Sequence, residues 1–359
     1  MLRLLLLCAC LGALEAAAVE VHETSKSTGG NSSPISLLLE NSKANGIQMF
    51  IGNVAVGTPP QVMSAVFDTQ HALSYFPSIK CEDPGCKMRK RYDSSISSTY
   101  KEDGTPFTLP GQNISGFLST DSLHVAGNTV ASQTFGEGTS DNNTFDQMTR
   151  NDGTLGLGFG NDTLLTSMVN QGLIPEQVFG LWLGRDPQGG ELSLGAVNKD
   201  LYSGEMTWAN IVNSAASWTV MADSIALDGH PEAALCPDGC SVIMASTTPY
   251  FMVSLERAKA ISDILGGTAV PNTPGFYFLD CATLSGLPTM QIKIGGRMME
   301  MTPQQYTFVL TFGGQQLCAS GFFGLPALTD QWLFGTLFMQ QFYTAYDVEN
   351  GRVGFADSV

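Results

Sequence analysis

Two side chains that can transfer protons stand close together in the stretch FDTQHALSYF, residues 67–76. Asp68 follows an apolar segment, and His71 comes three residues later. A carboxylate can serve as a general base, and a carboxylate with a histidine can activate a nucleophile. A hydrolytic pair would also need that nucleophile, and none accompanies these two residues. We therefore interpret His71 as a side chain that lines a cleft beside the carboxylate.

Charge and histidine content argue against two classes of function. The chain has 17 Lys and Arg against 33 Asp and Glu, a net charge of −16, whereas nucleic-acid binding needs a basic surface. Its one basic run, residues 87–91, is interpreted as a solvated loop. None of the four histidines lies at ligand spacing from a cysteine pair. We expect no nucleic-acid partner, no metal and no other cofactor.

The elements that must position these side chains are predicted to be short strands. The chain has 359 residues, enough for two domains, and its 43% apolar and 14% charged residues are typical of a folded core. Its 39 glycines recur with other turn-forming residues at short intervals. Two short helices are also predicted, at residues 164–169 and 258–265, where apolar residues recur at helical spacing. The sequence therefore predicts a mainly β fold with a few short helices.

The beginning of the chain predicts a secreted protein. Residues 1–18 contain Arg3, an apolar stretch and a run of alanines, a pattern typical of a cleaved signal peptide. No other stretch is long and apolar enough to cross a membrane. Residues 19–45 are polar, and we expect a mobile or vestigial segment there with at most one short strand at residues 35–39.

Six cysteines remain after the signal peptide, an even number that predicts disulfides in a secreted chain. Six cysteines allow 15 pairings. Two pairs lie close in sequence and predict the local bridges Cys81–Cys86 and Cys236–Cys240, which leaves Cys281–Cys318. Secretion also makes the Asn-x-Ser/Thr sequons candidate glycosylation sites; these are Asn31, Asn113, Asn142 and Asn161.

A series of motifs in the expected order resembles the pepsin-like aspartic protease family. They are VAVGTPPQVMSAVFDT (54–69), SSTYKEDG (97–104), DGTLGLGF (152–159), GELSLGAVNKDLYSGEMTW (190–208) and QQFYTAYDVENGRVGFA (340–356). The cysteine spacing also matches the three disulfides of this family. The resemblance implies a bilobal pepsin-like fold, two β-rich lobes with a cleft for an extended peptide. We expect the lobes at residues 46–203 and 204–359.

Catalysis in this family requires one carboxylate from each lobe, with one proton shared between them. One carboxylate activates a water molecule while the other holds the acidic proton. Each heads an Asp-Thr/Ser-Gly triplet, whose glycine lets the backbone approach closely. Residues 152–159 and 330–338 resemble each other, because each segment has a pair of apolar residues followed by a glycine. This weak internal repeat fits the same two-lobed plan.

The matching residues of this chain depart from both triplets. Asp68 and Thr69 match the first triplet, but Gln70 replaces its glycine, His71 a small hydroxyl residue and Tyr75 the usual Trp. The resemblance also places residues 245–247 at the second triplet. These residues are Ala245, Ser246 and Thr247, so the second carboxylate and the second glycine are absent.

Two further departures concern the flap and the pro-segment. Leu109 or Pro110 stands near the flap position where the family has Tyr, and residues 105–116 contain no Tyr. Residues 19–45 have only Lys26 and Lys43 as cations, whereas active members carry a basic pro-segment.

These departures favour a catalytically inactive member, a pseudoprotease, which could still bind extended peptides in the cleft. One alternative is a weak or atypical endopeptidase that uses Asp68, although Asp223 reads as structural and Asp238 as a surface residue. The other is a secreted, non-enzymatic protein with an idle cleft. We expect a monomer.

Overall fold

The structure is a computed structural model that describes residues 34–44, 47–109, 113–141, 151–160, 163–185, 188–212, 217–230, 235–236, 238–312 and 315–359. The predicted signal peptide and the sequons at Asn31, Asn142 and Asn161 lie outside these residues. Asn113 is described and exposed.

The described chain is mainly β, as predicted, and its strands form three sheets. The 13-stranded sheet has the order β11 (Tyr202–Asn210), β24 (Arg352–Ser358), β23 (Phe342–Asp347), β9 (Val178–Leu183), β10 (Gly190–Leu194), β1 (Ile35–Ala44), β2 (Ile47–Val56), β3 (Gln61–Asp68), β8 (Gly153–Gly156), β4 (Tyr75–Pro77), β7 (Asn128–Asp141), β6 (Ile114–Val125) and β5 (Lys101–Leu109).

Two smaller sheets make up the other half of the molecule. The 7-stranded sheet has the order β18 (Arg297–Met301), β17 (Met290–Ile294), β12 (Thr219–Leu227), β13 (Cys240–Met244), β22 (Trp332–Phe334), β14 (Phe251–Ser254) and β21 (Phe322–Leu325). The 4-stranded sheet has the order β15 (Thr268–Ala269), β16 (Tyr277–Leu279), β20 (Gln315–Ser320) and β19 (Thr307–Phe312). The helices are α1 (Pro84–Lys87), α2 (Leu164–Asn170), α3 (Leu255–Leu265), α4 (Pro303–Tyr306) and α5 (Thr336–Met339).

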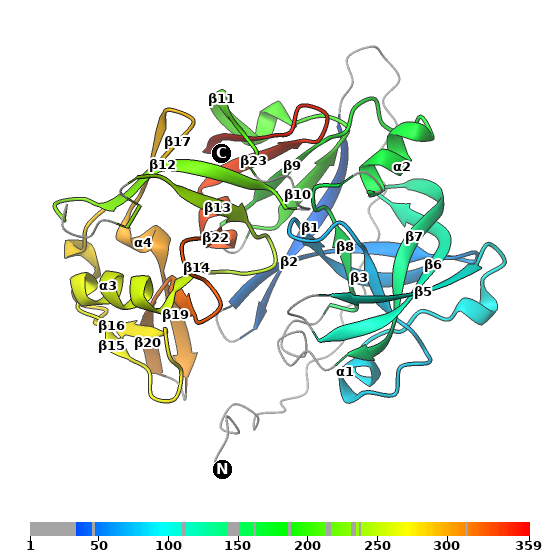
Figure 1. The fold of residues 1–359 in the computed structure, drawn as a ribbon, viewed down its shortest axis with the longest axis horizontal. Helices are drawn as coiled ribbons and strands as arrows, with labels where there is room; N and C mark the ends of the chain where they lie inside the picture. Colours follow the sequence, from blue (N-terminus) through cyan, green and yellow to red (C-terminus); the bar gives the residue numbers. More distant parts are fainter. Residues whose placement is uncertain are drawn as a thin grey trace.

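These sheets form two lobes, which lie on the right and left of Figure 1. The first lobe contains β2 to β8, and the second contains the 7- and 4-stranded sheets. Strands β23 and β24 from the end of the chain pair with β9 and β11, so one sheet joins the two parts of the sequence. The predicted boundary between residues 203 and 204 falls within β11, and the division of the chain into domains stays a prediction.

Local sequence explains both predicted helices. Helix α3 begins after Ser254, whose side chain accepts a hydrogen bond from the backbone N–H of Arg257, and it ends at Gly266 in the left-handed conformation. Helix α2 begins after Thr163, whose hydroxyl accepts from the N–H of Thr166. In each helix most of the apolar stripe is buried, as its spacing predicts, and Val169 and Ile264 are half-buried.

The short strand predicted at residues 35–39 is confirmed, but it continues to residue 44, so the prediction of a mobile segment is wrong for residues 40–44. Residues 35–44 form β1, which pairs along its first half with β10 and along its second half with β2. The polar sequence of the second half conceals this part of the strand, because backbone pairing with β2 holds it in the sheet.

Trp218 fills the core where the two lobes meet. Its side chain is fully buried, and its Nε1–H donates to the carbonyl of Leu157, 2.7 Å away. Phe179 and Tyr346 stack with ring centroids 4.4 Å apart, and both pack edge-on against Trp218. Aromatic packing therefore connects β9, the residue that precedes β12 of the second lobe, and β23 from the end of the chain.

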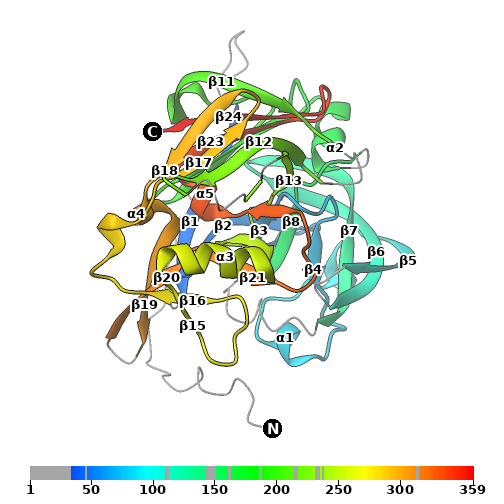
Figure 2. The ribbon, with the colours of Figure 1, turned by 60° about the vertical axis from the view of Figure 1, so that its left-hand side comes forward.

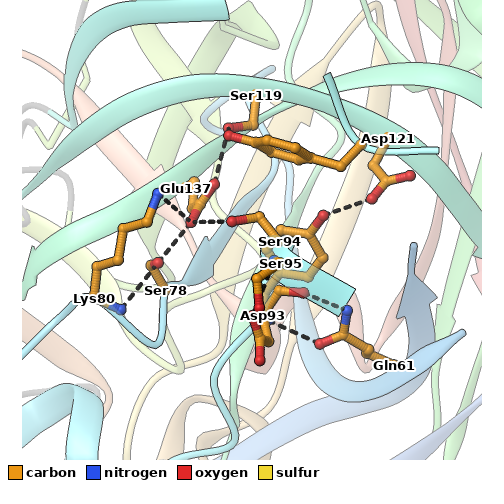
Figure 3. Close-up of polar contacts among 11 residues, drawn as sticks. Gln61, Ser78, Lys80, Asp93, Ser94, Ser95, Ser119, Asp121 and Glu137 are labelled. Atoms are coloured by element: carbon orange, nitrogen blue, oxygen red, sulfur yellow. Dashed lines mark hydrogen bonds and ion pairs between the residues drawn. The ribbon is translucent and has the colours of Figure 1, made fainter. Parts of the chain in front are cut away.

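A buried polar cluster in the first lobe holds β4 and β7 together (Figure 3). The carboxylate of Glu137 is fully buried and accepts hydrogen bonds from the hydroxyls of Ser78 at 2.6 Å and Ser119 at 3.0 Å. Ser94 approaches it at 3.4 Å, and the Lys80 ammonium lies 3.9 Å away. A buried charge needs such partners, so we interpret this cluster as structural.

All three predicted disulfides are confirmed. Cys81–Cys86 closes the segment around α1, and Cys236–Cys240 closes the turn before β13. Cys281–Cys318 ties the segment after β16 to β20. Within the described residues, none of the helices has the length and hydropathy needed to cross a bilayer.

Candidate active site

Each lobe places one strand end at the candidate site by the same arrangement. Strand β3 ends at Asp68 and pairs in parallel with β8, and β13 ends at Met244 and pairs in parallel with β22. Ala245 follows directly, and its N–H donates to the carbonyl of Phe334 at 2.9 Å. The weak repeat between residues 152–159 and 330–338 therefore corresponds to two equivalent parallel strand pairs.

A glycine allows close packing behind each strand end. A Cβ atom on Gly158 would lie 2.5 Å from the backbone carbon of His71, and one on Gly335 would lie 2.3 Å from the backbone oxygen of Thr248. Both distances are too short for any side chain. Gly158 and Gly335 are thus required, because they lie directly against the two segments that carry the site residues.

Reciprocal hydrogen bonds join the two strand ends across the lobes. The N–H of Thr69 donates to Ser246 Oγ at 3.0 Å, and the N–H of Ser246 donates to Thr69 Oγ1 at 3.1 Å. The Thr69 hydroxyl also donates to the carbonyl of Met244 at 2.7 Å, and the Ser246 hydroxyl donates to the carbonyl of Phe67. Both hydroxyl residues are buried, so these bonds fix the two strand ends against each other without competition from water.

Asp68 is buried with a histidine as its ionic partner. Only 1% of its surface is exposed, its Oδ2 lies 2.7 Å from His71 Nδ1, and its Oδ1 accepts from the N–H of Gln70 at 2.7 Å. The hydrogen bond to Asp68 raises the pKa of His71, burial opposes this change, and the negative charge of Asp68 adds to it. The structure thus pairs Asp68 with the His71 imidazole, where a dyad would pair it with a second carboxyl group.

The second-lobe position has no group that can replace the missing carboxylate. Ala245 is fully buried. The side chains at the two glycine positions contact each other across the site, since the hydroxyl of Thr247 donates to Oε1 of Gln70 at 3.3 Å. Both of these side chains are half-buried. A methyl group and a polar bridge therefore occupy the region where the resemblance expects a carboxylate and open backbone.

Tyr75 and Leu109 lie in a separate apolar cluster. Tyr75 is fully buried, and Leu109 ends β5 and packs with it and with Ile114. The Tyr75 hydroxyl donates to Asp141 Oδ2 at 3.0 Å, and Asp141 forms an ion pair with Arg89 at 2.9 Å. The flap residue is thus held by apolar contact with the residue that replaces the usual Trp, while residues 110–112 lie outside the described part of the chain.

The alternative carboxylates do not join this group. Asp223 lies in β12, and its Oδ2 accepts from the N–H of Gly296 at 3.1 Å, so it supports a hairpin. Asp238 is exposed. Both observations agree with the structural and surface roles expected for them. Among the described residues, no cluster of His, Cys, Asp and Glu could hold a metal ion.

Sequence reasoning placed the site residues but missed two of their contacts. The only sequence signal for the ion pair between His71 and Asp68 is that His71 lies three residues after Asp68, at the end of a predicted strand. The bridge between Gln70 and Thr247 joins residues far apart in the chain, and no local pattern predicts it.

Comparison with known proteins gives one consistent result. Residues 49–358 match the family model for eukaryotic aspartyl protease. The chain is 34% identical to mouse cathepsin D over 351 residues, which cover 91% of this chain and 84% of the relative. It is 35% identical to cathepsin E of Aquarana catesbeiana and 33% identical to cathepsin E-B of Xenopus laevis, each over 86% of this chain and 79% of the relative.

Proposed function

The chain belongs to the eukaryotic aspartyl protease family and has its bilobal pepsin-like fold, and we propose that it is a secreted, glycosylated member without peptidase activity. The observation that carries this proposal is Ala245, a buried methyl group at the position of the second-lobe carboxylate. One carboxylate can activate water, but the second carboxyl group that donates the proton in the family is absent. General acid–base assistance of this kind contributes roughly 10²–10⁴-fold to a rate.

The remaining carboxylate is also poorly placed for catalysis. Asp68 is engaged by His71 and by the N–H of Gln70. The side chains of Gln70 and Thr247 bridge the space between the strand ends, where an attacking water would need room. A weak endopeptidase that uses Asp68 alone would have to break this bridge first.

Binding of extended peptides is the function that this geometry supports in place of hydrolysis. The cross-lobe bonds of Thr69 and Ser246 hold the two strand ends together without any catalytic group. A cleft that keeps its frame can bind a peptide through backbone hydrogen bonds, which do not depend on the dyad. An idle cleft remains the alternative to this second proposal.

Secretion and glycosylation rest on three features. Residues 1–18 have the signal-peptide pattern, and the three disulfides fit an oxidising compartment. Asn113 is exposed at the turn after the flap strand, where a glycan can be attached without disturbing the core.

The test is digestion of a denatured protein at pH 2–7 by the purified chain and by Asp68→Asn, with a two-carboxylate family protease as the positive control. We expect no cleavage by either form. Cleavage by the wild type that disappears in Asp68→Asn would overturn the proposal. A peptide-library capture experiment with the same sample decides between a binding cleft and an idle one.

A further inference from the structure

Strand β19 forms an unprotected sheet edge on the second lobe. It pairs only with β20, and no other described strand lies on its outer side. Figure 2 shows it at the outer border of the molecule, below α4. Phe308 packs inward against Tyr250, with ring centroids 5.2 Å apart, whereas Val309 is 46% exposed. The outer side of β19, where no described strand pairs with it, therefore lies beside the exposed side chain of Val309.

The other sheet edges carry features that oppose pairing with another chain. Strand β5 begins with three charged residues and contains Pro106. Strand β11 has an irregular register between residues 203 and 207, and β18 contains Arg297 and Glu300. Strands β21 and β15 are only four and two residues long. Charges, proline, irregular register and short length are the usual protections of edge strands, and β19 has none of them.

The sequence around β19 is also free of charge. No Asp, Glu, Lys, Arg or His occurs from Met301 to Thr329, and no longer uncharged run exists in the chain. The whole chain carries a net charge of −16, so two copies repel each other at most approaches. Residues 301–329 add no charge to this repulsion at the β19 edge.

We propose that β19 is a self-association surface, where it pairs antiparallel with β19 of a second copy. Antiparallel pairing of identical strands is self-complementary and satisfies two-fold symmetry, so it closes as a dimer. The absence of charge favours a second copy over a charged partner. This inference replaces the monomer expected from the sequence, and it does not depend on the proposed function.

A single strand pair buries little surface, so the dimer is weak. Interfaces at the small end of the range are typical of transient complexes, and we expect a dissociation constant of about 10–100 μM. Higher ionic strength screens the repulsion between the acidic copies and so strengthens the association.

The test is sedimentation velocity of the full secreted chain from about 1 to 200 μM, at low and high salt. Val309→Lys places a charge on the edge, and Met298→Lys is its matched control, because Met298 is 49% exposed on the edge strand β18. We expect concentration-dependent dimers for the wild type and Met298→Lys, and monomers for Val309→Lys. A wild type that stays monomeric at every concentration, or equal behaviour of the two variants, would overturn the proposal.

Hydrogen exchange on the wild type provides a second measurement that needs no variant. Amides of residues 307–312 should gain protection as concentration rises, with a midpoint that matches sedimentation. The edge strand β5 should show no change. Dimers without this protection would place the contact elsewhere and contradict the inference, as would protection of β19 only when a foreign extended peptide is added.

Discussion

The two strand ends at the candidate site, residues 68–71 and 245–247, differ in what each has kept. Each lies at the end of a strand that pairs in parallel with a second strand, and that second strand ends at or directly before a glycine. Each also carries a hydroxyl residue that forms a hydrogen bond across the lobes. The first end retains its carboxylate and the second has a methyl group. Both have a side chain in place of glycine, and these side chains contact each other.

This difference separates two tasks that the family combines in one motif. The hydroxyl at the second position of each triplet makes the contacts that hold the lobes together, and it is present in both lobes. The first position supplies the chemistry, and there the lobes differ. Loss of the second-lobe carboxylate can therefore leave the frame intact, because the two tasks depend on different side chains.

Removing the cross-lobe hydroxyl should have the largest effect on stability. Thr69→Ala removes the donor to the Met244 carbonyl and the acceptor for the Ser246 N–H. Each of these two buried backbone groups costs about 1–3 kcal/mol without a partner, so we expect a loss of about 2–6 kcal/mol in the free energy of unfolding. Denaturant titration measures this loss.

A double-mutant cycle with Ser246→Ala serves as the control. Residues that share one network show a coupling energy of about 0.5–3 kcal/mol. Strictly additive effects would show that the two hydroxyls act independently and that the frame rests on other contacts.

Asp68 should have become a stabilising residue, unlike its counterpart Ala245. Asp68→Ala leaves the N–H of Gln70 and the imidazole of His71 without this acceptor. We expect a loss of about 1–3 kcal/mol, measured by the same titration. A stability gain on Asp68→Ala, of the kind seen when a purely catalytic carboxylate is removed, would contradict this role.

The ion pair also predicts a pH dependence. The hydrogen bond to Asp68 raises the pKa of His71 above 6.5 in the folded protein. The pair therefore contributes its full stability below about pH 6.5, and this contribution is lost as the pH rises through the folded value. NMR titration of the His71 ring should show the raised pKa, and Asp68→Asn should lower it. A titration midpoint that is the same in both proteins would refute the pairing.

The bridge between the glycine positions should matter least for stability. Gln70 and Thr247 are half-buried, so Thr247→Ala should cost about 0.5–1.5 kcal/mol at most. Gln70→Ala should cost no more, and the double variant should cost little beyond either single one. A loss as large as that of Thr69→Ala would mean that the bridge belongs to the frame.

Much of the fold and the positions of the site residues could be predicted from the sequence. Three local patterns have direct structural meaning: the position of Asp68 after an apolar strand, the two similar apolar segments that end in a glycine, and the cysteine spacing. Strand β1 was not predicted over its full length, because its polar second half is held by backbone pairing.

The contacts within the site were harder to predict. The cross-lobe bonds are accepted by the backbone carbonyls of Met244 and Phe67, so the side chains of these residues do not predict them. The bridge from Gln70 to Thr247 requires both lobes to be in place. Local patterns thus identify the residues, whereas the partners follow only from the three-dimensional arrangement.

Restoring the carboxylate and the two glycines is the most direct test of the proposed lack of peptidase activity. We compare the wild type, Ala245→Asp, and the triple variant Gln70→Gly, Ala245→Asp and Thr247→Gly in digestion of a denatured protein at acid pH, after checking that each is folded. We expect no cleavage by the wild type. We expect more cleavage by the triple variant than by the single one, because a misplacement of about 1 Å can cost 10²-fold in rate. A wild type that digests the substrate as well as the triple variant would contradict the proposed inactivity.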